Sequence, residues 1–171
     1  PAIVWQDGRT SDICSNWKKE GLEKNWISRT GLLLDPYFSA SKINWLINHE
    51  PAAIQAIADK DLCFGTVESW ILWKLTGGER HCSDMSNASR TLLMDLEKLE
   101  WVEDFCEIVG LPFDSLPELV PCQGHFGSIE KTLPFGGTPI TAMLGDQQAA
   151  TLGQLCLKEG EAKCTYGTGA F

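Results

Sequence analysis

The sequence lacks long apolar runs and has few basic residues. Its apolar runs, such as those at 3–5 and 32–34, are far shorter than the roughly 20 residues that cross a membrane as a helix. Lys and Arg total 14 against 23 Asp and Glu, which gives a net charge of −9. A chain this acidic repels a phosphate backbone. We therefore expect neither a membrane span nor a nucleic-acid partner.

Paired cysteines, metal-binding histidine patterns and a secretory signal are also missing. The seven cysteines are an odd number and no two form a Cys-x-x-Cys pair, so neither a disulfide framework nor a zinc site is indicated. The three histidines stand in no metal-ligand spacing. No charged start followed by an apolar core marks a signal peptide. We expect a cytoplasmic protein with free thiols, and we assign the cysteines no role.

Both ends of the sequence suggest a piece of a longer chain. Pro1 stands where an initiator methionine is expected, residues 2–5 have the pattern of a strand, and Phe171 follows closely on a Gly-rich turn. The 171 residues, 43% of them hydrophobic, are still enough for one domain with a buried core.

Helical periodicity predicts six helices, over 10–20, 39–50, 52–60, 66–75, 98–109 and 147–157. Apolar residues line two sides of 66–75, which predicts a buried helix. Short apolar runs predict strands at 2–5, 62–64, 91–96 and 139–144, and two more within 162–171. Residues 83–90 have the composition of a loop, and 112–121 that of an irregular crossing. This alternation predicts an α/β or α+β chain with a mixed sheet.

Asp146 is the carboxylate best placed for chemistry. It follows a strand-like run and stands at the start of a helix, at the sheet edge where α/β proteins bind ligands. Gly145 leaves room for a ligand, and Gln147 and Gln148 offer amides that bind hydroxyl groups. The alternative is an ordinary helix N-cap, a position that Asp often fills.

The Gly-rich segment 165–169, Thr-Tyr-Gly-Thr-Gly, is a second candidate site. Its two glycines let backbone N–H groups approach a phosphate, and a threonine hydroxyl can add a hydrogen bond. The alternative is a tight hairpin turn that uses glycine for positive φ.

Two aromatic side chains next to polar groups suit a polyol, which offers C–H faces and hydroxyls together. They are Trp5, which precedes Gln6, and Tyr37 within 35–38. Because the chain has seven tryptophans, core packing is the alternative for most of them.

Six segments taken together resemble the FGGY family of carbohydrate kinases, and in particular its members that phosphorylate glycerol. They lie at 2–6, 30–39, 64–67, 86–91, 145–150 and 165–169 and extend over nearly the whole chain. Segment 39–45 matches a signature of the wider family. Asp-Pro-Tyr-Phe-Ser at 35–39 and Gly-Asp-Gln-Gln at 145–148 look specific to the glycerol-phosphorylating members.

The resemblance implies two actin-like, ribonuclease H-like domains with ATP and glycerol in the cleft between them. Residues 1–154 would be the later part of the N-terminal domain, and residues 155–171 the first strands of the C-terminal domain. It also implies ATP and Mg²⁺ as cofactors, glycerol and ATP or ADP as ligands, and a homo-oligomer in the full-length form.

By matching positions, the resemblance assigns Asp146 as the catalytic base on a glycerol hydroxyl and as a neighbour of the magnesium ion. It assigns further glycerol-binding and ATP-facing positions, namely Trp5, Tyr37, Gln147 and Phe171 for glycerol and Thr168 and Gly169 for ATP.

The family's opening phosphate loop, its glycerol-binding Arg-Glu pair and its adenosine site lie outside these residues. We therefore expect the chain alone to be inactive. Two alternatives stay open. A kinase for another polyol or sugar would keep Asp146, whereas a non-catalytic polyol-binding module would have lost the base.

Overall fold

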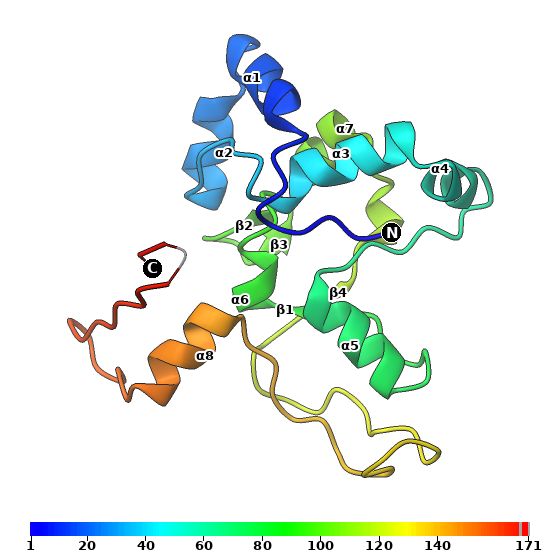
Figure 1. Cartoon of the computed structure of the whole chain (residues 1–171), viewed down its shortest axis with the longest axis vertical. Coiled ribbons are helices and arrows are strands. Elements are labelled where there is room, and N and C mark those ends of the chain that lie inside the picture. Colours follow the sequence, from blue (N-terminus) through cyan, green and yellow to red (C-terminus); the bar gives the residue numbers. More distant parts are fainter. Residues whose placement is uncertain (168, 171) are drawn as a thin grey trace.

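The computed structural model describes residues 1–167, 169 and 170 (Figure 1). Its elements in chain order are α1 (Ser11–Lys19), α2 (Glu23–Thr30), α3 (Ser39–His49), α4 (Pro51–Ala58), α5 (Val67–Leu75), β1 (Cys82–Asp84), α6 (Met85–Ala88), β2 (Met94–Asp95), β3 (Glu100–Trp101), α7 (Glu103–Val109), η1 (Phe113–Ser115), β4 (Glu118–Val120) and α8 (Asp146–Gly153). Among the described residues, no helix combines the length and the apolar character needed to cross a membrane.

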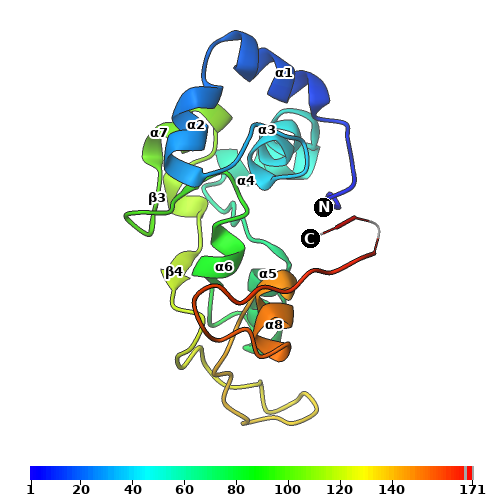
Figure 2. The ribbon, with the colours of Figure 1, turned by 90° about the vertical axis from the view of Figure 1, so that its left-hand side faces the viewer.

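The larger core lies among α1, α2, α3 and α7, which gather at one end of the molecule (Figures 1 and 2). Trp26 is fully buried at its centre, stacked on Phe105 at 4.3 Å and on Trp17 at 5.5 Å between ring centroids. The indole Nε1 of Trp26 donates a hydrogen bond to the carbonyl of Leu92 at 2.8 Å. The indole stabilises this core because its apolar area is removed from water and its N–H keeps a hydrogen-bond partner.

A smaller core joins α5 to the strand pair that supports the candidate site. β1 and β4 run parallel, with Cys82 opposite Glu118, and β2 pairs antiparallel with β3. Leu72 of α5 packs with Cys82, Val120 and Phe126 in this core. The long loop 121–144 extends beyond it, as Figure 1 shows, and leads into α8.

Four of the six predicted helices, those over 10–20, 39–50, 52–60 and 66–75, are confirmed as α1, α3, α4 and α5. Helix α2 has no counterpart in the prediction, because its eight residues carry only Trp26 and Ile27 as apolar side chains. The other two predicted helices are too long. Residues 100–101 form β3 ahead of α7, and α8 ends at Gly153.

The prediction that 66–75 is buried is wrong. Val67, Trp70 and Ile71 are 71%, 60% and 50% exposed, and only Ser69 and Leu72 are buried. The helix is apolar on two sides, but within the described residues only one side packs against the smaller core.

Most of the predicted strands do not form. Residues 2–5 and 62–64 have no strand partner in the described part of the chain, and 139–144 makes isolated bridges from Pro139 and Ala142 only. Within 162–171 the described residues form one bridge and no strand. The run 91–96 shortens to β2. A strand needs a partner, which a short apolar run does not specify.

The prediction of a loop at 83–90 is wrong, because this segment includes the end of β1 and the whole of α6. The Asp84 carboxylate caps α6 by accepting a hydrogen bond from the Ser86 N–H. The irregular crossing at 112–121 holds η1 and β4. The polar composition of 83–90 predicted a loop, although one of its polar residues, Asp84, is the N-cap of a short helix.

Candidate functional site

Asp146 is the first residue of α8, and the N-cap of that helix is Gly145. Asp146 is exposed, and its Oδ1 accepts a hydrogen bond from the Gln147 N–H at 2.8 Å. The interpretation of Asp146 as an N-cap is therefore wrong, because the carboxylate stands one position inside the helix. A carboxylate at a helix N-terminus is stabilised by the helix dipole and is available to a ligand.

Gly145 is buried, and a Cβ at this position would lie 2.6 Å from Oε1 of Gln148. Because Gln148 is exposed and its side chain can turn away, this contact alone does not require glycine. The Gly145 N–H donates a hydrogen bond to Ser86 Oγ at 2.7 Å. The turn that carries Asp146 is thus attached to the residues after β1.

A buried aspartate stands behind that attachment. Asp84 is fully buried and accepts hydrogen bonds from the Ser86 N–H at 2.9 Å, from Asn87 Nδ2 at 2.7 Å and from the Cys122 thiol at 3.2 Å. Ser86 Oγ also donates to the Asp84 carboxylate. Burial, and then the Asp84 carboxylate beside it, raises the pKa of Cys122. The hydrogen bonds from Ser86 to Asp84 and from Gly145 to Ser86 therefore link β1 to the start of α8.

The sequence analysis missed Asp84 as a site residue. The signal was present, since an Asp two residues before a Ser, at the start of a short helix, is typical of a capping turn. Its contact with Cys122, 38 residues later, could not be predicted from that pattern.

Gln147 is held by a lysine that the sequence analysis also missed. Lys163 Nζ donates hydrogen bonds to Gln147 Oε1 and to Thr165 Oγ1, the latter at 2.8 Å. Lys163 and Thr165 line a hollow of about 470 Å³ beside α8. One cation thus joins the amide next to Asp146 to the start of the Gly-rich segment.

The Gly-rich segment forms a tight turn. Tyr166 and Ala170 make an antiparallel bridge, and the Gly167 N–H donates to the carbonyl of Gly169 at 3.0 Å. A Cβ on Gly167 would meet nothing within 4 Å, so this backbone is open to a ligand. Two of the predicted site residues, Thr168 and Phe171, lie outside the described residues.

Trp5 and Tyr37 come together from two segments that are 32 positions apart in the sequence. Their ring centroids are 5.4 Å apart with the planes tilted by 55°. The two side chains are 43% and 37% exposed, so neither is a core residue. Core packing, the alternative for Trp5, is therefore wrong, and the pair presents aromatic surface to solvent.

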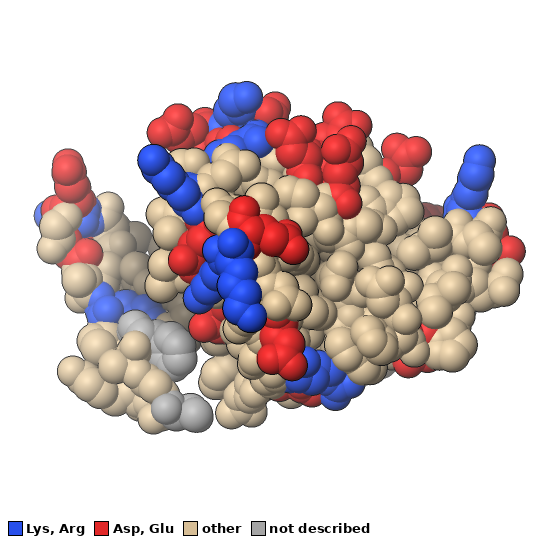
Figure 3. All heavy atoms as spheres, turned by 90° about the horizontal axis from the view of Figure 1, so that it is seen from above, with Lys and Arg blue, Asp and Glu red and all other residues tan. Residues whose placement is uncertain are grey.

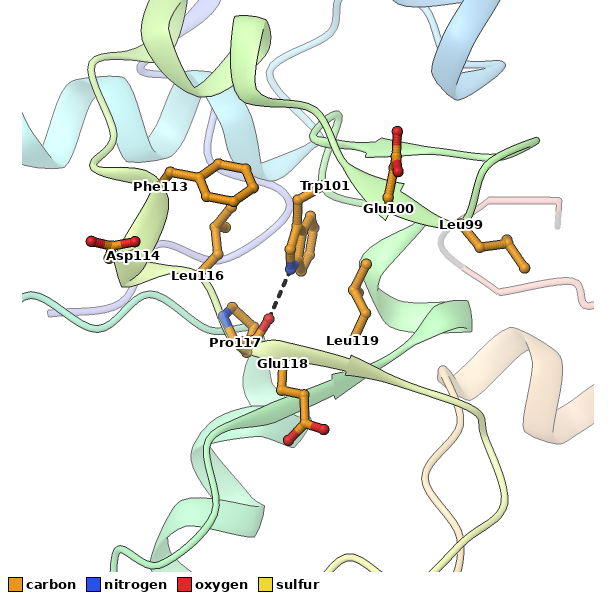
Figure 4. Close-up of a pocket in the computed structure, with 9 residues that line it drawn as sticks. All are labelled: Leu99, Glu100, Trp101, Phe113, Asp114, Leu116, Pro117, Glu118 and Leu119. Carbon is orange, nitrogen blue, oxygen red and sulfur yellow. Dashed lines mark hydrogen bonds between the residues drawn. The ribbon is translucent and has the colours of Figure 1, made fainter.

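A separate hollow of about 510 Å³ lies where β3, η1 and β4 meet (Figure 4). Trp101 stands in it, with its Nε1 donating a hydrogen bond to the carbonyl of Pro117 at 2.8 Å. None of the predicted site residues lines this hollow.

The arrangement around Asp146 fits a magnesium ion held largely by a nucleotide. Within the described residues, no three His, Cys, Asp or Glu side chains come together as a metal-binding group. Mg²⁺ in phosphoryl-transfer sites needs only one or two carboxylates, because phosphate oxygens and water supply the other ligands. The exposed Asp146 carboxylate meets that requirement.

Comparison with known proteins points to one family. The N-terminal domain of the FGGY family of carbohydrate kinases matches residues 1–153. The glycerol kinase of Thermus brockianus is 52% identical over 171 residues, which are 100% of this chain and 34% of that protein. The glycerol kinase of Rhizobium meliloti (strain 1021) is 48% identical over 170 residues, 99% of this chain and 34% of that protein. The chain thus spans about a third of the length of these curated relatives.

Solved structures agree with the sequence comparison. A crystal structure of Plasmodium falciparum glycerol kinase with ADP matches 99% of this chain with a TM-score of 0.93 at 40% identity, over 34% of its own length. A ligand-bound xylulose kinase from Lactobacillus acidophilus matches 88% of this chain with a TM-score of 0.75, over 31% of its length. At 20% identity the second likeness shows the fold alone.

Proposed function

Because the chain belongs to the FGGY family of carbohydrate kinases, we propose that the full-length protein that carries it phosphorylates glycerol with ATP. The products are glycerol 3-phosphate and ADP. The observation that carries this proposal is the 52% identity to a glycerol kinase over the whole chain. Since the chain spans about a third of such a protein, the activity is proposed for the whole protein.

We assign residues 1–154 to the later part of the N-terminal kinase domain and residues 155–171 to the first strands of the C-terminal domain. The family match, which ends at residue 153, supports this boundary. We also propose ATP and Mg²⁺ as cofactors and the cytoplasm as the location. A homo-oligomeric full-length form stays a prediction.

In the proposed reaction, Asp146 is the catalytic base. Phosphoryl transfer passes through a loose transition state, so the protein mainly aligns the attacking hydroxyl and accepts its proton late. An exposed carboxylate at the start of a helix can accept that proton. Mg²⁺, when bound with ATP, supplies positive charge to the phosphate oxygens.

Gln147 orients the glycerol hydroxyls. Its Oε1 accepts a hydrogen bond from Lys163, which turns the amide nitrogen away from that lysine. The NH₂ group is then available to donate to a glycerol oxygen. Lys163 therefore fixes which end of the amide the substrate meets.

Trp5 and Tyr37 form the wall against which the carbon chain of glycerol packs. Their rings, 5.4 Å apart, offer two aromatic faces to C–H groups. An apolar wall also keeps water, the competing nucleophile, away from the phosphoryl group. Phe171, Thr168 and Gly169 keep the roles that the family resemblance assigns to them.

The test is a substrate panel on the full-length protein. Glycerol, erythritol, xylulose and gluconate are each assayed with ATP by coupled ADP release. We expect kcat/KM for glycerol to exceed that for every other substrate at least tenfold. A higher kcat/KM for xylulose or gluconate would show a sugar kinase, and saturable glycerol binding without turnover would show a binding module.

A further inference from the structure

Lys42 is a buried cation that the proposed reaction does not yet use. It lies in α3 and is only 6% exposed. Its ammonium donates hydrogen bonds to two backbone carbonyls, that of Asp7 at 2.8 Å and that of Pro36 at 2.5 Å. Neither acceptor lies in a helix or a strand. One side chain of a helix therefore holds two irregular segments together.

Holding this cation in place has a free-energy cost. Desolvation lowers the pKa of Lys42, and the nearby acidic groups Asp7, Cys14 and Asp35 oppose that shift only in part. A buried cation whose hydrogen-bond acceptors are neutral carbonyls is less stable than an apolar side chain of the same length in the same space. The ammonium makes hydrogen bonds to two carbonyls, which an apolar side chain cannot make.

The two carbonyls flank the aromatic pair. Asp7 comes two residues after Trp5, and Pro36 directly precedes Tyr37. Among the hydrogen bonds of the described residues, the one from Lys42 to Asp7 alone connects residues 1–7 to any residue beyond 9. Within the described residues, this ammonium is therefore the one hydrogen-bonded link between the segment that carries Trp5 and the chain beyond Arg9.

We propose that Lys42 is a positioning residue of the glycerol pocket. By holding the Asp7 and Pro36 carbonyls on one ammonium, it sets the spacing of the Trp5 and Tyr37 rings and thus the width of the slot for the polyol. This inference rests on the proposed function. It assigns Lys42 no contact with the substrate, so its loss affects glycerol binding through the two aromatic rings.

The first experiment separates binding from chemistry. In the full-length protein, Lys42→Met keeps an unbranched side chain, one atom shorter than lysine, and removes its donors. We expect the KM for glycerol to rise at least tenfold, while kcat stays within threefold and the KM for ATP is unchanged. Lys42→Arg, which keeps charged donors, should recover most of the loss. The matched control is Lys19→Met, at an exposed lysine of α1, which should change neither constant.

The second experiment tests whether Lys42 acts through Trp5. Lys42→Met is combined with Trp5→Ala in a double-mutant cycle on kcat/KM for glycerol. If Lys42 positions the indole, the lysine substitution should lower kcat/KM by less than threefold once the indole is gone. Equal effects in both backgrounds would overturn the proposal.

Other outcomes are equally decisive. An unchanged glycerol KM in Lys42→Met, with a lower melting temperature, would show that the lysine only stabilises the fold. If Lys42→Met does not fold, Lys42→Gln, whose shorter uncharged side chain cannot reach both carbonyls, replaces it in both experiments. A glycerol KM for Lys42→Gln equal to that of the parent would then overturn the proposal. A parent that does not phosphorylate glycerol refutes the proposed function instead, and the cycle is then measured with the substrate that it does accept.

Discussion

At the scale of single residues, the proposed reaction depends on Asp146 as the catalytic base. Asp146→Asn should lower kcat by about 10² to 10⁴, because an amide cannot accept the proton of the attacking hydroxyl. Glycerol binding should weaken but stay measurable, since the amide still forms hydrogen bonds. Steady-state kinetics and calorimetric titration with glycerol test both parts. Activity within tenfold of the parent would mean that Asp146 is not the base.

Asp84 supports the turn that carries Asp146 without reaching the substrate. In Asp84→Asn, one carboxylate oxygen becomes a donor that faces the Ser86 N–H or the Asn87 amide, so a buried hydrogen bond is lost. We expect a loss of about 1–3 kcal/mol in the free energy of unfolding. We also expect a lower kcat with little change in the KM for ATP.

The measurement is urea unfolding of the full-length protein together with steady-state kinetics. Asp114→Asn, at an exposed aspartate of η1, is the control and should change neither quantity. Equal stabilities of the parent and Asp84→Asn would contradict the structural role of the buried carboxylate.

The candidate site residues were proposed from sequence patterns, whereas the residues that hold them in place were not. Asp146 and Gln147 stand out because they follow a strand-like run and start a helix. Lys42, Asp84 and Lys163 were missed, because each acts through contacts with segments distant in the sequence. The Trp5 and Tyr37 pair was proposed residue by residue, and only the structure brings the two rings together.

At the scale of elements, an ion pair joins α2 to β2. Arg29 Nε donates to Asp95 Oδ2 at 2.9 Å, and this hydrogen bond, followed by one from the Lys98 N–H, lowers the pKa of Asp95. A carboxylate with a lowered pKa in the folded state stabilises that state above its pKa in the unfolded chain. The contribution is lost as the pH falls toward the folded-state value.

Arg29→Gln should therefore reduce stability near neutral pH, and the difference from the parent should shrink as the pH falls below about 4. Urea midpoints measured between pH 7 and pH 3 test this expectation. Lys24→Gln, at an exposed lysine of the same helix, serves as the control. A difference that stays constant over the whole pH range would show that Asp95 does not contribute through its charge.

Helices were predicted more reliably than strands for a physical reason. Each helix forms its hydrogen bonds within one segment, so the apolar periodicity was sufficient for α1, α3 and α5. β1 depends on β4, and no local pattern indicates which segments pair. The apolar run 62–64 had the composition of a strand but no partner strand among the described residues.

At the scale of the whole molecule, the expected α/β chain of actin-like fold is confirmed by its relatives of solved structure. On the face seen from the α1 end, acidic and basic side chains are intermixed, next to a broad uncharged area (Figure 3). Away from that end, in the lower half of Figure 1, α5 exposes Val67, Trp70 and Ile71. The full-length relatives are about three times as long as this chain.

We predict that the 171-residue chain alone shows no ATP-dependent phosphorylation of glycerol. Its relatives match it over about a third of their length, and the proposed cleft needs both kinase domains. The measurement is a coupled assay on the purified chain, with the full-length protein as positive control. Turnover by the chain alone would contradict both the domain assignment and the site.

The parallel pairing of β1 with β4 also sets an order of events during synthesis. Cys82 pairs with Glu118, 36 residues later in the sequence. A ribosome adds about 5–20 residues per second, so β1 leaves the ribosome about 2 to 7 s before its partner. Helix α5 is made before either strand, and its Leu72 packs with Cys82. This helix is therefore the element that can shield the nascent strand while β4 is still being translated.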